Sequence, residues 1–320
     1  MDSSWAIFRA VIFGYSKVSE ATTTEGFRGL DKWFQTSYSE DRGVIVEHAV
    51  YRVSEVGFLI QKLGGRYAET IWTSRIVFKD AKPSYLVCRY HEDTDYGERV
   101  EYCSKLTRSS RGYCSLHANT PKVLYEMCAQ GVDDACRKAS RYFDKESFTV
   151  YLLDYGGSRV KVGLTRSSRF LWRISEQPHI ATAQVFVGDL ISSRIREKEL
   201  GRHRFATEGP GARLEKRVEL AMKIVEERGS DASFLGRRVA SFISILGLSG
   251  TFRSYTILPN NVSLLKKAMR IDIEKLLGRK LIVKDYWGGF VVFSDEDTGE
   301  YFLVSKKSLL HYPIRVILSD

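Results

Sequence analysis

The amino-acid sequence predicts an α+β protein with several domains. Runs of β-branched and aromatic residues, broken by Gly, Asp and Ser, alternate along the chain with segments that have helical spacing. Of the 320 residues, 43% are hydrophobic and 12% are aromatic, a composition typical of folded rather than disordered proteins. A chain of this length can bury more than one core. Its pattern divides it into four parts, with boundaries near residues 84, 146 and 230.

Residues 1–84 are expected to form a β-rich N-terminal region. Its apolar runs alternate in part with polar residues, as half-buried strands do. They are WAIFRAVIFGY at 5–15, GVIVEHAVYRV at 43–53 and SRIVFKDA at 74–81. We find no set of catalytic residue types in this region.

Residues 85–146 contain all five cysteines and are expected to form a zinc-ribbon-like module with a helical extension. One short helix is predicted after the cysteine-rich part, because Pro121 suits a first turn and Gly131 suits a helix stop. A second helix is expected to begin near Asp133, since carboxylates are favourable at helix N-termini.

Residues 147–230 have the pattern strand, Gly-Gly turn, strand, helix, strand, helix. The five segments are 148–155, 158–165, 167–177, 180–189 and 190–203. Residues 231–320 begin with helical spacing at 232–247 and 263–278. Short strands with Gly-rich turns follow, and they predict a small antiparallel β-barrel or sandwich.

The charge balance favours an acidic partner. The 49 Lys and Arg residues exceed the 39 Asp and Glu residues, which gives a net charge of +10. Nucleic acid is the partner that such a surplus most often meets, with the ribosome as one form of it, although a basic surface without a specific partner is the simpler interpretation. No apolar run approaches the roughly 18 residues of a membrane span. The first residues are acidic, whereas a secretory signal is basic. A cytoplasmic protein without a membrane partner is therefore expected.

The cysteine cluster predicts a structural zinc site. Two pairs have the spacing C-x2-H, which lets one turn aim both ligands at one ion. The polar stretch between them has little to bury, so a metal would supply folding energy. The five potential ligands are Cys88, His91, Cys103, Cys114 and His117. Zinc takes four, and the sequence leaves open which four bind. Ordinary buried thiols and surface histidines are the alternative.

Two strand motifs resemble those of the GIY-YIG nuclease superfamily. The first is TVYLL at 149–153, which contains Tyr151, and the second is Lys161-Val162-Gly163. In that superfamily an arginine follows on the next helix and a glutamate on the helix after the third strand. The run KVGLTR…WRISEQ is also similar to an archaeal and bacterial family of unknown function with an upstream zinc-type module and a small β-rich C-terminus. That likeness covers residues 85–320.

The resemblance implies a Mg²⁺-dependent endonuclease with Tyr151, Arg173 and a glutamate in its site. Tyr151 would lie near the nucleophile, and Arg173 would stabilise the developing phosphate charge. Glu199 would bind Mg²⁺, with His203 one turn later on the same helix face and Glu197 as the second choice. Lys161 stands where the superfamily has a tyrosine. This replacement favours the alternative of a non-catalytic DNA-, RNA- or ribosome-binding protein built on the same scaffold.

Arginines dominate the region around these motifs. Between positions 159 and 204 there are ten basic and four acidic residues. Arginine pairs with two phosphate oxygens at once, so this excess predicts contacts to a nucleic-acid backbone. Besides the residues above, the predicted contacts are Arg159, Arg166, Arg169, Arg194, Arg196, Arg202 and Arg204.

Overall fold

The computed structural model describes residues 4–25, 43–72, 75–82, 84–92, 96–208 and 214–319. Within these ranges the fold is mixed α/β, as the sequence predicts, with sixteen strands and eight α-helices. No α-helix in the described ranges is both long and apolar enough for a membrane span.

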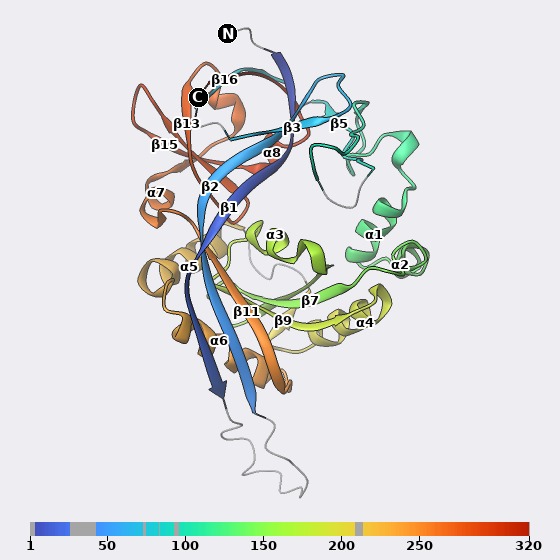
Figure 1. The fold of residues 1–320 in the computed structure, drawn as a ribbon, viewed down its shortest axis with the longest axis vertical. Coiled ribbons are helices and arrows are strands. Elements are labelled where there is room, and N and C mark those ends of the chain that lie inside the picture. Colours follow the sequence, from blue (N-terminus) through green and yellow to red (C-terminus); the bar gives the residue numbers. More distant parts are fainter. Residues whose placement is uncertain are drawn as a thin grey trace, which may run out of the picture. The chain divides into compact units, whose positions relative to one another are not determined.

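The chain forms two compact units whose segments interleave along the sequence. Unit 1 comprises Met1–Tyr15, Val53–Gly131 and Pro259–Asp320, and unit 2 comprises Ser16–Arg52 and Val132–Leu258. Strands β1 (Ser4–Glu25) and β2 (Val44–Lys62) are long, and each contributes residues to both units (Figure 1). Neither unit is therefore one continuous stretch of sequence. The four-part division remains a prediction.

Unit 1 is dominated by antiparallel strands. Its other strands are β3 (Ala68–Ile71), β4 (Arg75–Ala81), β5 (Leu86–Val87), β6 (Leu106–Thr107), β12 (Met269–Arg270), β13 (Lys280–Trp287), β14 (Phe290–Asp295), β15 (Tyr301–Ser305) and β16 (Pro313–Ser319). The order is β1-β16-β4-β13-β14-β15-β12, while β3 pairs with β2 and β5 with β6. The predicted C-terminal strands are thus present, and their closure into a barrel is not confirmed.

Aromatic side chains fill the core of unit 1. Phe8 meets Phe58 edge to face, with ring centroids 5.2 Å apart. Phe78 and Phe293 repeat this geometry at 5.9 Å. All four rings are buried, and such pairs stabilise a core beyond the area that they bury.

The helices of unit 1 are short. They are α1 (Pro121–Ala129), α7 (Val262–Lys267) and α8 (Lys306–Leu309), with 3-10 turns at Ser115–His117 and Ile273–Leu276. Helix α1 begins at Pro121, as predicted. The single helix predicted at 263–278 is wrong. Ala268 adopts an extended backbone after α7, and β12 then pairs with β15. Strand pairing here overrides the local helical preference.

Unit 2 contains the predicted hairpin. Strands β7 (Phe148–Asp154) and β8 (Val160–Arg166) pair antiparallel, and Gly156 has the positive φ of 92° that their connection requires. The sheet order is β10-β8-β7-β9-β11-β2, with β9 at Ala181–Gly188, β10 at Ala206–Thr207 and β11 at Gly250–Leu258. Strand β11 was not predicted. It pairs antiparallel with β9 and parallel with β2.

The helices of unit 2 are α2 (Asp133–Ser140), α3 (Phe170–Ser175), α4 (Leu190–Gly201), α5 (Leu214–Arg228) and α6 (Ala232–Ile245). Helix α5 was not predicted. The Asp189 side chain caps α4 by accepting hydrogen bonds from the backbone of Ile191 and Ser192 at 2.8 and 3.0 Å. Helix α4 packs against β7, β8 and β9. The order strand, strand, helix, strand, helix therefore holds from β7 to α4.

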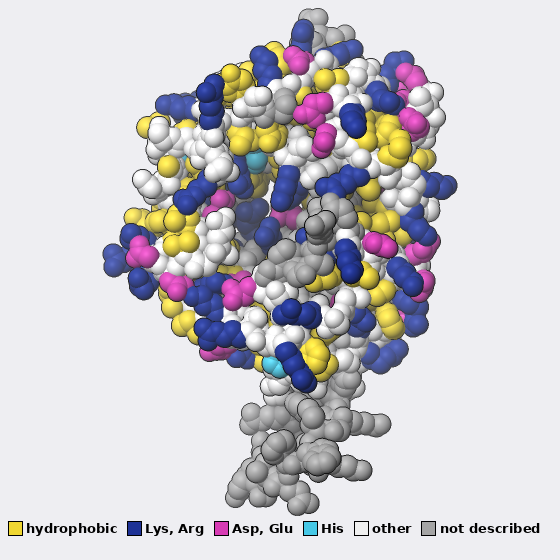
Figure 2. Space-filling view, turned by 180° about the vertical axis from the view of Figure 1, so that it is seen from behind, with side chains coloured by type: hydrophobic (Ala, Val, Ile, Leu, Met, Phe, Trp, Pro, Cys, Tyr) yellow, Lys and Arg dark blue, Asp and Glu magenta, His cyan; other side chains and the backbone are white. Residues whose placement is uncertain are grey.

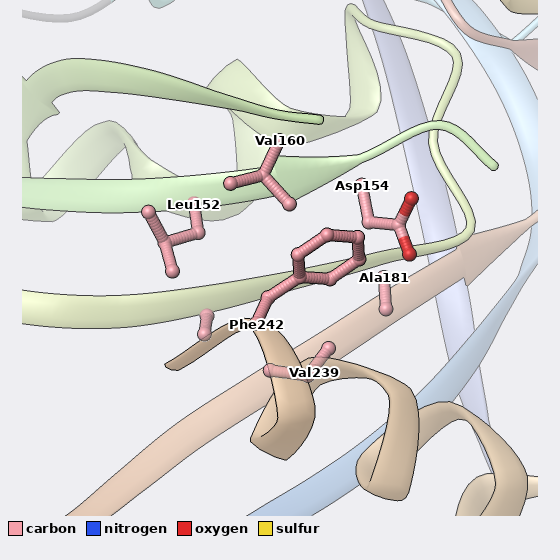
Figure 3. Close-up of a pocket in the computed structure, with 7 residues that line it drawn as sticks. Leu152, Asp154, Val160, Ala181, Val239 and Phe242 are labelled. Atoms are coloured by element: carbon pink, nitrogen blue, oxygen red, sulfur yellow. The ribbon is translucent and has the colours of Figure 1, made fainter. Parts of the chain in front are cut away.

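A small cavity in unit 2 is lined by strand residues and by α6. Phe242 and Val239 of α6 point toward Leu152 and Val160 (Figure 3). Asp154 also lines it and is 2% exposed. Its carboxylate accepts hydrogen bonds from Arg238 Nε at 2.5 Å and from the Gly156 backbone at 2.8 Å. The cavity is thus mostly apolar, with one paired charge at its edge.

Candidate functional site

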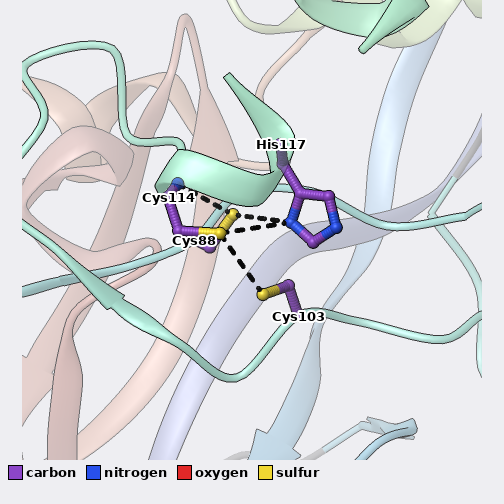
Figure 4. Close-up of side chains that lie close together, drawn as sticks. All are labelled: Cys88, Cys103, Cys114 and His117. Atoms are coloured by element: carbon purple, nitrogen blue, oxygen red, sulfur yellow. Dashed lines mark hydrogen bonds between the residues drawn. The ribbon is translucent and has the colours of Figure 1, made fainter. Parts of the chain in front are cut away.

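Four of the five predicted zinc ligands come together in unit 1. The ligand atoms of Cys88, Cys103, Cys114 and His117 all lie within 4.8 Å of one another. In Figure 4 these side chains converge on one point. Three thiols and one imidazole are a donor set that suits a tetrahedral metal ion.

Backbone hydrogen bonds hold the segments that carry these ligands. The Cys88 N–H donates to Lys105 O at 2.8 Å, and the Cys103 N–H donates to Tyr90 O at 3.0 Å. Cys114 precedes the 3-10 turn Ser115–His117, and its carbonyl accepts from the His117 N–H at 2.9 Å. The C-x2-H spacing therefore turns both side chains toward the same point.

The distances within the cluster fit a four-ligand ion. His117 Nδ1 lies 3.5 Å from Cys88 Sγ and 3.4 Å from Cys114 Sγ, and the sulfurs of Cys103 and Cys114 are 4.0 Å apart. A tetrahedral zinc with its usual bond lengths would place two sulfurs about 3.8 Å apart and a sulfur and a nitrogen about 3.5 Å apart. The residues present therefore fit this metal.

The local environment shifts the pKa of Cys88, Cys114 and His117. Burial raises the pKa of the Cys88 thiol to about 12, although the backbone N–H groups of Cys114 and Tyr90 favour its thiolate. Burial also opposes the Cys114 thiolate, but hydrogen bonds from Cys88 and the backbone outweigh it and lower that pKa. Burial lowers the pKa of His117, which keeps the imidazole neutral and able to bind a metal. Its ring stacks on Tyr90 with centroids 3.8 Å apart.

His91 is the one of the five potential ligands that lies outside this cluster. Its Nε2 faces the ammonium of Lys122. Its ring contacts Tyr96 and Tyr102, with centroids 4.4 and 5.5 Å away. The C-x2-H pair of residues 88–91 thus divides: Cys88 joins the cluster, and His91 packs among aromatic rings.

In unit 2 three predicted or motif residues form a hydrogen-bonded chain. Gln177 Nε2 donates to the Tyr151 hydroxyl at 3.0 Å, and Gln177 Oε1 accepts from Lys161 Nζ at 2.6 Å. His179 Nδ1 lies 2.8 Å from Gln177 O, and His179 Nε2 accepts from the Ile257 N–H at 3.2 Å. His179 is therefore a neutral ring that donates from Nδ1, and it ties the backbone of Gln177 to β11.

Positive charge surrounds Lys161. Burial, together with the guanidinium groups of Arg173 and Arg217, lowers its pKa to about 7, while Glu197 acts in the opposite direction. Lys161 makes one hydrogen bond and the Tyr151 hydroxyl donates to no acceptor among the described residues. Lys161 is half-buried and can therefore donate to an added anion, whereas the Tyr151 side chain is 1% exposed.

The two glutamates of α4 occupy different environments. The Glu199 side chain is 52% exposed and pairs with Arg196 at 3.1 Å. The Glu197 side chain is 6% exposed and pairs with Arg194 at 2.5 Å. Burial raises the pKa of Glu197, and Lys161 is close enough to lower it in part. The residue predicted as second choice is therefore the one beside Lys161.

The other predicted catalytic residues do not all meet there. Arg173 is near Lys161 electrostatically and pairs with Glu176 at 2.9 Å. His203 instead contacts Phe205, with ring centroids 5.8 Å apart. Nothing in the described structure links His203 to Tyr151 or Lys161.

Two of the seven predicted backbone-binding arginines are buried in ion pairs. Arg166 pairs with Glu146 at 3.5 Å, and Arg194 pairs with Glu197 and Glu208. These two are corrected to structural roles because their guanidinium groups already meet carboxylates. The Arg159 guanidinium donates to the carbonyl of Ala206. The predicted arginines that are exposed or half-buried are Arg159, Arg169, Arg196, Arg202 and Arg204. Figure 2 shows Lys and Arg side chains widely spread over the face in view, with fewer acidic ones.

The sequence reasoning missed three residues that the structure connects to these sites. Gln177 is the last residue of the run KVGLTR…WRISEQ, and no role was predicted for it. Arg217 lies on the unpredicted helix α5, and Arg9 lies on β1, far in sequence from the cysteines that it contacts. No local sequence signal identifies the last two.

Comparison of the chain with protein-family models, with curated proteins and with solved structures gives no match.

Proposed function

We propose that this chain binds nucleic acid, that unit 2 contacts a backbone phosphate at Lys161, and that unit 1 is stabilised by zinc. The observation that supports phosphate binding is the set of donors around Lys161. The half-buried ammonium of Lys161 is within electrostatic reach of the Arg173 and Arg217 guanidinium groups, and Glu197 is the carboxylate among the described residues that acts on it. Arg173 also pairs with Glu176 at 2.9 Å. A phosphate would accept a hydrogen bond from the Lys161 ammonium and relieve the repulsion among these three cations.

Zinc is proposed for the cluster of three cysteines and one histidine. When bound, the ion would supply a cross-link between segments that share only a small buried cluster, formed by Cys88, Tyr113, Cys114 and Val123. Cys88, Cys103, Cys114 and His117 would fill all four positions, so a structural role is proposed rather than a catalytic one.

Binding is tested by fluorescence anisotropy with single- and double-stranded DNA and RNA at several salt concentrations. Lys161→Met is expected to weaken binding and to reduce the salt slope by about one, since one phosphate contact is lost. The matched control is Arg315→Met, because Arg315 is an exposed cation in unit 1. An affinity that changes neither with salt concentration nor in Lys161→Met would refute the proposal. The comparison between the four probes separates DNA from RNA.

A second proposed function is Mg²⁺-dependent phosphodiester cleavage. The placement of Glu197 beside Lys161 favours it, together with the resemblance of β7 and β8 to GIY-YIG motifs. The tight pairing of Glu197 with Arg194 opposes it, because a metal would compete with that arginine. Incubation of the nucleic acid that binds best with Mg²⁺ or Mn²⁺ tests this function separately from binding.

A further inference from the structure

Arg9 is a fully buried cation on β1 that contacts the backbone of two proposed metal ligands. Its Nη1 donates to Cys88 O at 2.7 Å, and its Nη2 donates to Cys103 O at 2.5 Å. Nε and Nη2 also donate to Gln61 Oε1, at 2.8 and 2.5 Å. Gln61 is itself held by a hydrogen bond from Nε2 to Gly65 O. The side chain is 0% exposed.

No carboxylate pairs with Arg9 in the described part of the chain. All of its hydrogen-bond acceptors are neutral oxygens, and the ring of Tyr102 lies 5.2 Å from its guanidinium carbon. A guanidinium is not deprotonated in proteins, so Arg9 carries a positive charge. The acidic groups that act on it are Tyr96, Tyr102, Cys88 and Cys103. A buried charge without an opposite charge is strongly unfavourable.

With a divalent ion bound, the donor set of this cluster would provide that opposite charge. A divalent ion bound by three thiolates and one neutral imidazole carries a net charge of −1. Four thiolates would give −2, and two thiolates with two imidazoles would give zero. The single positive charge of Arg9 would therefore balance the net charge of −1 on an ion bound by Cys88, Cys103, Cys114 and His117.

We propose that Arg9 is the counter-charge of a zinc–Cys3His centre, and that its bonds to Cys88 O and Cys103 O position the two ligands. The inference rests on the proposed zinc site. It makes Arg9 a positioning residue that acts through the ligands rather than a ligand itself. Partners of this kind commonly change metal affinity 10- to 100-fold.

The test measures zinc affinity of the full chain by competition with a chromophoric chelator. Arg9→Met is expected to weaken zinc binding about 10- to 100-fold. Arg9→Lys keeps the positive charge but loses the planar guanidinium that donates to both carbonyls. Its zinc affinity should therefore lie much nearer to that of the wild type. Arg315→Met is the control, because it removes an exposed positive charge from the same unit.

A second measurement separates two roles of Arg9: a counter-charge to the zinc centre, and a structural clamp that only holds the backbone by hydrogen bonds. Thermal unfolding is followed with zinc bound and after chelation. A clamp would lower the melting temperature equally in both forms, whereas a counter-charge makes Arg9→Met cost more in the zinc form. Equal losses, with unchanged zinc affinity, would overturn the inference.

Two other results must be told apart from a failure of the counter-charge inference. A wild-type chain that binds no zinc removes the proposed metal itself. If Arg9→Met does not fold, the zinc affinity of Arg9→Lys tests the inference instead. A 100-fold or greater loss of zinc affinity in this charge-preserving variant would show that Arg9 does not act as a counter-charge.

Discussion

The ring of Tyr151 lies over Gly163, its register partner on the neighbouring strand of the β7–β8 hairpin. A methyl group at position 163 would stand 2.4 Å from Tyr151 Cζ and 2.5 Å from its hydroxyl oxygen. The glycine of the KVG motif is therefore needed because the tyrosine of the TVYLL motif occupies its side-chain space. The two motifs therefore pack together, and this packing places the Tyr151 hydroxyl where it accepts a hydrogen bond from Gln177.

Gly163→Ala is expected to destabilise the protein by about 1–3 kcal/mol, as overpacking of a filled core does. Urea denaturation measures the change. Gly97→Ala is the control, because its new methyl would meet only Val100 Cγ2, at 3.5 Å. In a Tyr151→Ala background the cost of Gly163→Ala should fall sharply. If Gly163→Ala destabilises the Tyr151→Ala protein as much as the wild type, the tyrosine ring is not what excludes a side chain at position 163.

Cys114→Ser is expected to abolish stoichiometric zinc and to lower the melting temperature, because three ligands hold a structural ion poorly. Metal analysis of the purified wild type should give about one zinc per chain. His91→Gln is the matched control, since His91 lies outside the cluster. Full metal content in Cys114→Ser, or its loss in His91→Gln, would contradict the site.

Lys161→Met is expected to stabilise the protein while it weakens nucleic-acid binding. The folded pKa of Lys161 is about 7, well below the ordinary value of about 10.4. Between these values the unfolded chain binds a proton that the folded chain does not, so wild-type stability rises with pH across this window. Denaturation at pH 7, 8 and 9 should show a shallower rise in Lys161→Met.

The same titration predicts that wild-type affinity for nucleic acid falls as the pH rises through about 7, because the ammonium is lost. Anisotropy titrations at constant salt measure this. The pH dependence should be absent from Lys161→Met. Its persistence in that variant would assign the effect to another group.

Glu197→Gln is expected to remove any metal-dependent cleavage, whereas Glu199→Gln should leave it unchanged. Glu197 lies beside Lys161, and Glu199 is exposed on the far side of α4. Because Glu197→Gln also weakens the buried pair with Arg194, its melting temperature is measured alongside. Cleavage lost only in Glu199→Gln would restore the ligand first predicted from the sequence.

Arg238→Met is expected to cost about 3–5 kcal/mol, because it leaves the buried Asp154 carboxylate without its partner. Burial already raises the pKa of Asp154, and Arg238 opposes that rise. The folded protein therefore holds this proton to higher pH than the unfolded chain, and loss of Arg238 raises the folded pKa further, so the stability of Arg238→Met falls more steeply as the pH rises. Arg237→Met, an exposed neighbour on α6, is the control and should show no such loss.

The parts of the fold that the sequence predicts well are those that depend on local chemistry. The β7–β8 hairpin follows from two strand-like runs around Gly156 and Gly157, and the turn between Cys114 and His117 follows from their spacing. The sequence does not predict β11, because its pairing with β2 joins segments about 200 residues apart, as Ser254 and His48 show.

The choice between Glu197 and Glu199 shows why the site could not be completed from sequence. Two residues apart on a helix, they point in nearly opposite directions. The buried face of α4 has Leu190 and Leu200 near its ends, but Ser193, Arg194 and Glu197 lie between them. The apolar stripe that would identify the inward face is therefore interrupted by polar residues. His91 is a similar case, because its spacing from Cys88 equals that of His117 from Cys114 and only the fold separates them.

Strand β16 lies between β1 and β4, so Ser4 pairs with Val316 and Arg75 with Ser319. During translation the early strands of unit 1 leave the ribosome long before the strand that separates them. Until then, β1 and β4 each expose an edge that other chains could join. Native unit 1 can close only after synthesis reaches β16. Chaperones that shield strand edges during translation would therefore raise the yield of folded protein, and removal of residues 313–319 should leave unit 1 prone to aggregation.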